Sequence, residues 1–124
     1  MKEIFIVLMM IFCHIIDDYK LQGILASMKQ KKWWQEQKEY KNLYKYDYIW
    51  ALITHSFSWS FMIMLPIIFI KSFEIKTTFL IVFILNMITH AVVDDLKANK
   101  FKINLIQDQI IHLIQIVVTA IILL

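Results

Sequence analysis

The sequence predicts an all-α protein, a four-helix bundle that crosses a membrane four times. The 124 residues are 60% hydrophobic and include one glycine and one proline, and the mean hydropathy is +0.61. This composition is too apolar for an ordinary soluble domain of this size. Four segments also meet the length of roughly 20 mostly apolar residues that a membrane helix needs. We expect a single transmembrane domain over residues 1–124, with helices near 4–24, 47–70, 77–96 and 104–124.

The first segment, 4–24, could be mistaken for a secretory signal peptide because it opens on a basic residue and continues through an apolar run. A signal peptide would carry a small-residue cleavage site after that run. His14, Asp17 and Asp18 follow it instead. We therefore expect a helix of the mature protein.

The other three segments are apolar runs separated by charged connections. The second, 47–70, carries the single proline, Pro66, which we expect to bend the helix. The third, 77–96, and the fourth, 104–124, are apolar except for polar residues spaced three or four apart. That spacing places the polar residues on one face of a helix, so each segment is predicted to carry one polar stripe.

Lysines concentrate in two of the three connections between segments. The first-to-second and third-to-fourth connections hold Lys29, Lys31, Lys32, Lys38, Lys41, Lys45, Lys97, Lys100 and Lys102. Basic loops stay in the cytoplasm under the positive-inside rule. We therefore expect these two connections to be cytoplasmic and both termini to lie on the outer side.

Residues 28–46 interleave these lysines with tryptophan and tyrosine. This composition beside a membrane helix is typical of an interfacial segment that contacts anionic lipid headgroups. Nucleic-acid binding is the competing interpretation of a basic run. We expect no nucleic-acid partner, because these aromatic residues match the membrane-interface belt. A plain cytoplasmic loop without a ligand is the third possibility.

Histidine and aspartate recur four residues apart in three of the segments, and their order reverses in the last. Antiparallel helices need this reversal to bring all pairs to one depth. At about 1.5 Å of rise per residue, a fourth histidine in the second segment falls at a similar depth. These residues are His14, Asp18, His55, His90, Asp94, Asp108 and His112.

Charged side chains that face lipid cost roughly 2.5–3.5 kcal/mol each, so this layer needs an explanation. Imidazole and carboxylate are ligands of zinc, and manganese or iron can use the same donors. A bound cation would compensate the carboxylates. We predict that these seven residues bind one or two metal ions, with zinc as the first expectation; around a single ion, several of the seven would instead orient the ligands. A hydrogen-bonded network without metal, structural or proton-conducting, is the alternative.

Other polar residues neighbour these ligands or share their helix faces. We expect them to orient the ligands or to face headgroups. They are Asp17, Gln22, Asn86, Asp95 and Gln115. The sequence contains no glycine-rich phosphate loop, no H-E-x-x-H zinc-protease motif and no G-x-S-x-G nucleophile elbow, which excludes those soluble enzyme classes.

The motifs H-x-x-x-D-x-x-x-Q from His14, a lone His55, H-x-x-x-D-x-x-K from His90 and D-Q-x-x-H from Asp108 follow in this order. Over essentially the whole chain, this set resembles a family of small phage and bacterial inner-membrane proteins catalogued as a domain of unknown function. The doubled aspartates and the long first loop depart from the family's pattern. The resemblance implies shared polar positions in a four-helix inner-membrane domain but supplies no activity. A looser similarity is to membrane-bound metal-dependent hydrolases.

An internal two-fold repeat is also visible. A His/Asp pair, a basic loop and a histidine follow one another twice, ending at His55 and at His112. This pattern predicts a parallel repeat about an axis along the membrane normal, as some transporters have.

The expected function is metal-dependent hydrolysis of an amphiphilic substrate, such as a phospholipid or a lipid-linked phosphate, at the cytoplasmic leaflet. Asp18, Asp94 or Asp108 would act as the general base. An ion or metal transporter is the alternative, and four helices would then require a homo-oligomer. A non-enzymatic phage membrane factor with a structural His/Asp core is the third possibility.

Overall fold

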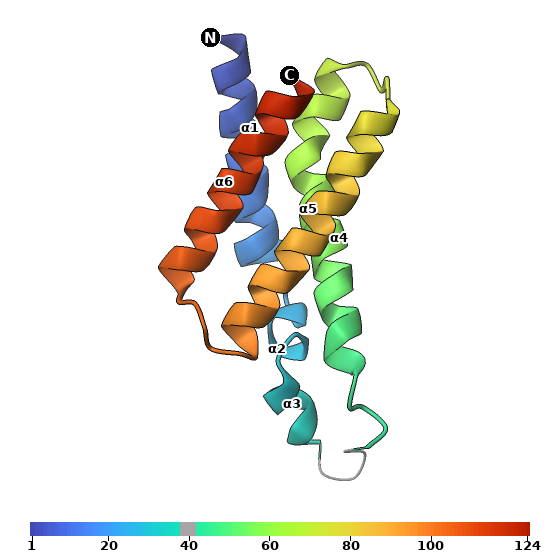
Figure 1. Ribbon diagram of the computed structural model, residues 1–124, viewed down its shortest axis with the longest axis vertical. Coiled ribbons are helices and arrows are strands. Elements are labelled where there is room, and N and C mark those ends of the chain that lie inside the picture. Colours follow the sequence, from blue (N-terminus) through green and yellow to red (C-terminus); the bar gives the residue numbers. More distant parts are fainter. Residues whose placement is uncertain (38–41) are drawn as a thin grey trace.

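The computed structural model in Figure 1 describes residues 1–37 and 42–124 of the chain. Every regular element in that part of the chain is a helix, so the all-α prediction is confirmed. The long elements are α1 (Lys2–Ile16), which continues into the π turn η1 (Asp17–Leu21), α4 (Asp47–Ile70), α5 (Thr77–Ala98) and α6 (Leu105–Leu123). Both termini lie at the same end of the molecule.

Within the described residues, three helices are long and apolar enough to cross a membrane: α4, α5 and α6, of 24, 22 and 19 residues. The predicted spans 47–70, 77–96 and 104–124 match them within two residues at each end. Large apolar side chains cover their outer faces, and Leu85 and Ile121 are 57% and 76% exposed. Extensive apolar surface of this kind marks contact with a membrane or a partner. Length, composition and surface together indicate a membrane protein.

The first predicted span, 4–24, is not one continuous α-helix. α1 ends at Ile16 after 15 residues, and the next five residues form the π turn η1. Gly23 then takes a φ of +48°, a left-handed conformation that ends the helical stretch. A π turn is a single-turn widening of a helix, and the apolar run gave no sign of it. Membrane crossing by α1 therefore stays a prediction.

Local sequence fixes the start of α6, which carries two of the predicted ligands. Asn104 and Gln107 form a capping box: the Gln107 N–H donates to Asn104 Oδ1 over 2.9 Å, and the Asn104 N–H donates to Gln107 Oε1 over 3.0 Å. Such a box satisfies two backbone donors that the helix itself leaves free. Asp108 follows in the first turn of α6, so the cap sets its position.

The long helices pack in a ring, in which α1 and α5 each contact both α4 and α6. An apolar core, including Ile6, Trp59, Val82 and Ile116, fills the half of the ring nearer the termini. Buried polar and charged residues come from these helices, from η1 and from the residue that follows α2. They are His14, Asp17, Asp18, Lys29, His55, Ser56, Ser60, Asn86, His90, Asp94, Asp108, His112 and Thr119.

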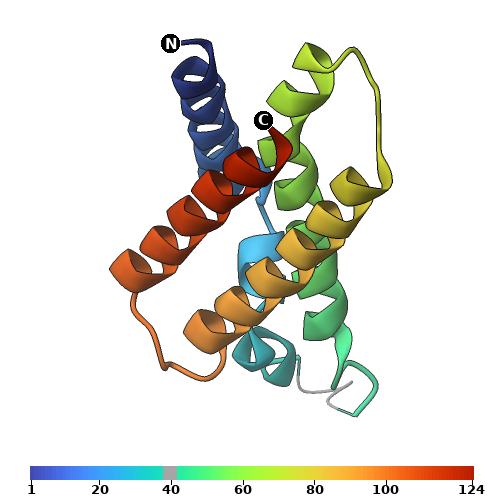
Figure 2. The ribbon, with the colours of Figure 1, turned by 45° about the horizontal axis from the view of Figure 1, so that its top comes forward.

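Two short helices, α2 (Leu25–Met28) and α3 (Lys31–Gln35), lie at the end of the molecule opposite the termini (Figures 1 and 2). Asn99, just beyond α5, ties them to that helix. Its side-chain amide donates to the Lys29 carbonyl over 3.0 Å, and its Oδ1 accepts from the Lys31 N–H over 2.7 Å. The backbone at Lys29 is thereby fixed beside the end of α5.

Candidate metal centre

The structure brings all seven predicted ligands into one buried layer. His14 comes from α1, Asp18 from η1 and His55 from α4. α5 contributes one His/Asp pair and α6 the other, in the reversed order that the sequence analysis noted. None of the seven is more than 7% exposed. A layer of this kind must have its polar atoms paired with one another or with a ligand.

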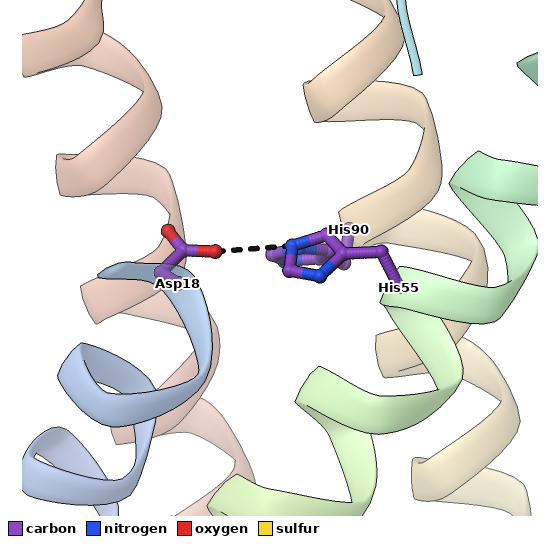
Figure 3. Close-up of side chains that lie close together, drawn as sticks. All are labelled: Asp18, His55 and His90. Atoms are coloured by element: carbon purple, nitrogen blue, oxygen red, sulfur yellow. Dashed lines mark hydrogen bonds and ion pairs between the residues drawn. The ribbon is translucent and has the colours of Figure 1, made fainter. Parts of the chain in front are cut away.

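One side of the layer is built around His55. Its Nε2 lies 3.1 Å from Asp18 Oδ1 and 3.7 Å from Asp94 Oδ2. His90 Nε2 lies 3.7 Å from the same Asp94 oxygen. Figure 3 shows Asp18 and His55 pointing toward each other from different helices, with His90 beside them.

The other side of the layer is built around His112. Its Nε2 lies 3.3 Å from Asp108 Oδ1 and 3.6 Å from Asp94 Oδ1. Asp94 therefore faces both sides, with one carboxylate oxygen toward each.

These side chains form three groups of donor atoms, each positioned to hold a metal ion. The groups are Asp18, His55 and His90; His90, Asp94 and His112; and Asp18, Asp108 and His112. Within each group the donor atoms lie within 4.8 Å of one another.

Several inward-facing atoms of these groups have no hydrogen-bond partner within the described chain. They are both ring nitrogens of His90, Nε2 of His112 and Oδ1 of Asp108. Buried polar atoms are rarely left unpaired. Each neutral imidazole keeps one N–H, and a cation would satisfy the remaining lone pairs of His90 and His112 in one group or those of His112 and Asp108 in another.

A chain of amides holds His112 in the orientation that a ligand needs. The Gln115 amide nitrogen donates to the carbonyl and Oδ1 of Asn86, both over 3.3 Å, which leaves Gln115 Oε1 to accept from His112 Nδ1 over 3.1 Å. With its proton on Nδ1, the ring presents the Nε2 lone pair to the carboxylates. Hydrogen bonds of this kind fix the tautomer of a metal-binding histidine. Asn86 and Gln115 thus lie where the sequence analysis expected orienting residues.

His14 has a different role from the one its spacing predicted. The Trp59 indole N–H donates to its Nδ1 over 2.7 Å, and its Nε2 lies 3.1 Å from Gln109 Oε1. Both ring nitrogens are therefore engaged, and His14 belongs to none of the three groups. Gln109 in turn restrains two carboxylates, because its amide nitrogen donates to Asp18 and to Asp108, each over 3.1 Å. In this geometry His14 positions carboxylates.

The remaining predicted residues fall on different sides of the centre. Asp17 accepts a hydrogen bond from Ser58 over 2.6 Å, and its Oδ2 lies 3.6 Å from His55 Nδ1, behind the ring. Gln22 donates to the backbone carbonyl of Asp18. Asp95 pairs with Asn99 and Lys100, over 2.8 Å and 3.1 Å, and belongs to none of the three groups.

Two lysines that were not predicted as site residues contact carboxylates of the centre. Lys29 Nζ lies 2.5 Å from Asp94 Oδ2, and Lys97 Nζ lies 2.5 Å from Asp108 Oδ2. Lys97 follows Asp94 at the three-residue spacing of one helical face, a signal that was present in the D-x-x-K motif. Lys29 carried no signal, because it is one of six similar lysines in the first connection.

Aromatic stacking fixes the ring planes at the centre. Trp59 stacks on His90 with ring centroids 4.2 Å apart, and His90 stacks on His112 at 4.1 Å. Stacked rings of this size resist rotation in a packed interior. The imidazole nitrogens are therefore held in place before any ligand binds.

The charges of the centre are unequal. Four aspartates (Asp17, Asp18, Asp94 and Asp108) and two lysines (Lys29 and Lys97) lie in it. With neutral histidines and ionised aspartates, two negative charges remain. An uncompensated charge in a low-dielectric interior is strongly unfavourable, and one divalent cation would cancel the excess.

Fold and site together define an all-helical membrane protein with buried histidine and aspartate groups positioned to hold a metal ion. No protein-family model, curated protein or solved structure matches the chain. The resemblance drawn from the motifs therefore stays a prediction. Any function has to be inferred from the chemistry of the site.

Proposed function

We propose that this protein is a metal-dependent hydrolase of the bacterial inner membrane that acts on a phospholipid or a lipid-linked phosphate at the cytoplasmic leaflet. The observation that carries this proposal is the pairing of a buried His/Asp donor set with two ammonium groups, those of Lys29 and Lys97. Imidazole and carboxylate hold a metal ion, whereas lysine is a common phosphate-binding residue. A cation carrier would gain nothing from two ammonium groups that compete with its cargo.

The proposed membrane arrangement is a four-helix bundle in which α1 is the fourth span. Its outward residues Ile4, Phe5, Leu8 and Phe12 are 56–64% exposed and apolar, which suits lipid contact. Both termini lie at one end of the molecule, and α2, α3 and the connection between α5 and α6 lie at the other (Figure 1). The positive-inside rule then places the termini outside. The internal two-fold repeat remains part of this proposal.

The residues around the ion would divide the chemistry between them. When bound, a divalent ion supplies Lewis acidity and makes water a better nucleophile at neutral pH; zinc is the first candidate, and manganese or iron accept the same donors. A carboxylate oxygen of Asp18, Asp94 or Asp108 that is not bound to an ion accepts a proton from the attacking water. Lys29 and Lys97 neutralise the phosphoryl oxygens.

An amphiphilic substrate is supported by the surface around Lys31, two residues after Lys29. A cavity of about 330 Å³ is lined by residues that include Lys31, Trp34, Lys45 and Tyr48. The ammonium group of Lys31 lies 4.7 Å from the centroid of the Tyr48 ring. Basic and aromatic side chains together suit an anionic headgroup at the membrane surface. We propose membrane lipids, rather than nucleic acid, as partners of this segment.

The test measures metal and turnover in the same preparations. Detergent-purified protein is analysed for metal by mass spectrometry and then assayed for phosphate release from vesicles that contain phosphatidic acid or a lipid-linked diphosphate. We expect bound metal and metal-dependent release in the wild type, with both lost in His90→Ala, His112→Ala. Lys29→Gln should retain metal and lose release, whereas Lys100→Gln, on an exposed pair, should retain both. Full metal content without release from either substrate would overturn the hydrolase assignment.

A further inference from the structure

We propose that the centre binds two divalent ions side by side, with the carboxylates of Asp18 and Asp94 shared between them. The proposal rests on the metal-binding part of the proposed function and adds the number of ions and the identity of the bridging ligands. Four observations lead to it: the overlap of the donor groups, the direction of each carboxylate oxygen, the spacing and the charge.

The donor groups overlap in a way that separates two positions. Asp18, His55 and His90 form one group, and Asp18, Asp108 and His112 form another. These two groups share only Asp18, and the third group, His90, Asp94 and His112, takes one histidine from each of them. A four-coordinate site for zinc takes four ligands, and the centre presents six side chains once Asp94 is included. The second set of donors therefore has room for an ion of its own.

Asp94 faces each position with a different oxygen. Its Oδ2 lies 3.7 Å from Nε2 of both His55 and His90, and its Oδ1 lies 3.6 Å from His112 Nε2. A carboxylate whose two oxygens face two sets of histidines has the geometry of a bridge. Asp18 is the second bridge, because its Oδ1 lies 3.1 Å from His55 Nε2 and the residue also belongs to the His112 group.

The histidine-to-carboxylate spacing fits two ions, and the Lys29 ammonium group, 2.5 Å from Asp94 Oδ2, would share that oxygen with one of them. Four ligands at about 2.0–2.1 Å from a tetrahedral ion lie roughly 3.3–3.4 Å from one another, and the histidine-to-carboxylate distances in both sets are 3.1–3.7 Å. His90 belongs to one set and His112 to the other, and their rings stack with centroids 4.1 Å apart. Paired catalytic ions lie about 3.5–4 Å apart, which is close to the separation of these two rings.

The charge balance distinguishes the two ions. One dication cancels the net charge of minus two that the four aspartates and two lysines leave, whereas a second dication gives a net charge of plus two. A phosphate dianion would cancel that excess. The second ion should therefore bind more weakly than the first, and inorganic phosphate should tighten its binding. By linkage, the second ion should tighten phosphate binding by the same factor.

The experiment counts ions directly in metal-free protein kept in detergent. Mn²⁺ is added to saturation, with and without inorganic phosphate, bound metal is measured by mass spectrometry, and electron paramagnetic resonance reports whether neighbouring ions couple magnetically. We expect two equivalents, a coupled spectrum, and a dissociation constant for the second ion that phosphate lowers by about tenfold. His55→Ala and His112→Ala should each keep one equivalent and lose the coupling. Asp95→Asn, outside the centre, should keep two.

A single equivalent at saturation, with phosphate present and without it, overturns the proposal. The wild-type count and spectrum decide the question even where a variant fails to fold. Failure of the hydrolase proposal is recognised separately. Two coupled ions without lipid hydrolysis would contradict the hydrolase proposal and support the two-ion centre. Hydrolysis with a single bound ion would support the hydrolase proposal and contradict the two-ion centre.

Discussion

The ammonium nitrogen of Lys29 lies 2.5 Å from Oδ2 of Asp94, although 65 residues separate the two along the chain. Lys29 is 5% exposed and Asp94 is 1% exposed. The segment after α1 thus delivers a positive charge to the carboxylate that faces both halves of the metal centre. This ion pair links the segment of α2 and α3 to the buried layer.

Replacement of Lys29 by methionine should destabilise the metal-free protein. Removing one partner of a buried ion pair leaves an uncompensated charge and costs about 3–5 kcal/mol. Bound Mn²⁺ or Zn²⁺ should restore most of the loss, because the cation then compensates Asp94. Thermal unfolding in detergent, with and without metal, measures both effects. Lys100→Met is the matched control, since its pair with Asp95 is half exposed and such pairs contribute little. Equal melting temperatures for the two metal-free variants would contradict the role of the pair.

Trp59→Phe should weaken metal binding while the fold survives. Phenylalanine keeps an aromatic ring against His90 but cannot donate to His14 Nδ1, so the chain of hydrogen bonds through Gln109 to the carboxylates loses its anchor. Loss of such an orienting contact typically lowers metal affinity about 10–100-fold. Equilibrium dialysis against Zn²⁺ gives the affinity. Trp50→Phe, at a site 72% exposed, is the control and should bind like the wild type.

Acidification should weaken metal binding. Protons and metal ions compete for the same Nε2 lone pairs of His55, His90 and His112, so each proton that the metal must displace makes its affinity depend on pH. The dissociation constant should rise as the pH is lowered from neutral to mildly acidic values, because the ligands must release their protons before they bind the ion. Dialysis at several pH values measures it. A dissociation constant that does not change over this range would show that the histidines do not hold the ion.

Gly23→Val should lower stability by roughly 1–2 kcal/mol, because a β-branched residue at positive φ is strained. The space around Gly23 is open, with the carbonyl oxygen of Leu21 at 3.9 Å as the nearest atom to an added Cβ. The cost is therefore expected from the backbone alone. Gly23→Asn should lose much less, since asparagine tolerates this conformation. Thermal unfolding of the two variants separates them, and equal losses would point to a packing effect instead.

The sequence allowed the depth of the polar layer to be predicted, because helical rise and a four-residue spacing are regular. The pairs His90–Asp94 and Asp108–His112 do meet, with Asp94 Oδ1 only 3.6 Å from His112 Nε2. The contacts of His14 could not be predicted. Whether a histidine faces a cation or an indole depends on which side chain of α4 lies opposite, and this requires helix rotation to be known to within a fraction of a turn. Here Trp59 lies opposite.

The π turn was the other feature beyond the reach of the pattern. Adjacent residues on an α-helix point about 100° apart, so Asp17 was expected to turn away from Asp18. In η1 both aspartates are buried, and both contact His55. No simple composition rule marks where such a turn begins.

The order in which the chain is synthesised gives the two ion pairs a further meaning. Translation proceeds from the N-terminus, so Lys29 is made before Asp94 and Lys97 before Asp108. In each pair, the lysine is therefore synthesised before the aspartate, whose carboxylate lies 2.5 Å from the lysine nitrogen in the folded protein. In the proposed topology, each acidic helix would enter the membrane after the lysine that pairs with its aspartate has been made. The same two pairs that balance the finished centre would therefore also ease its insertion.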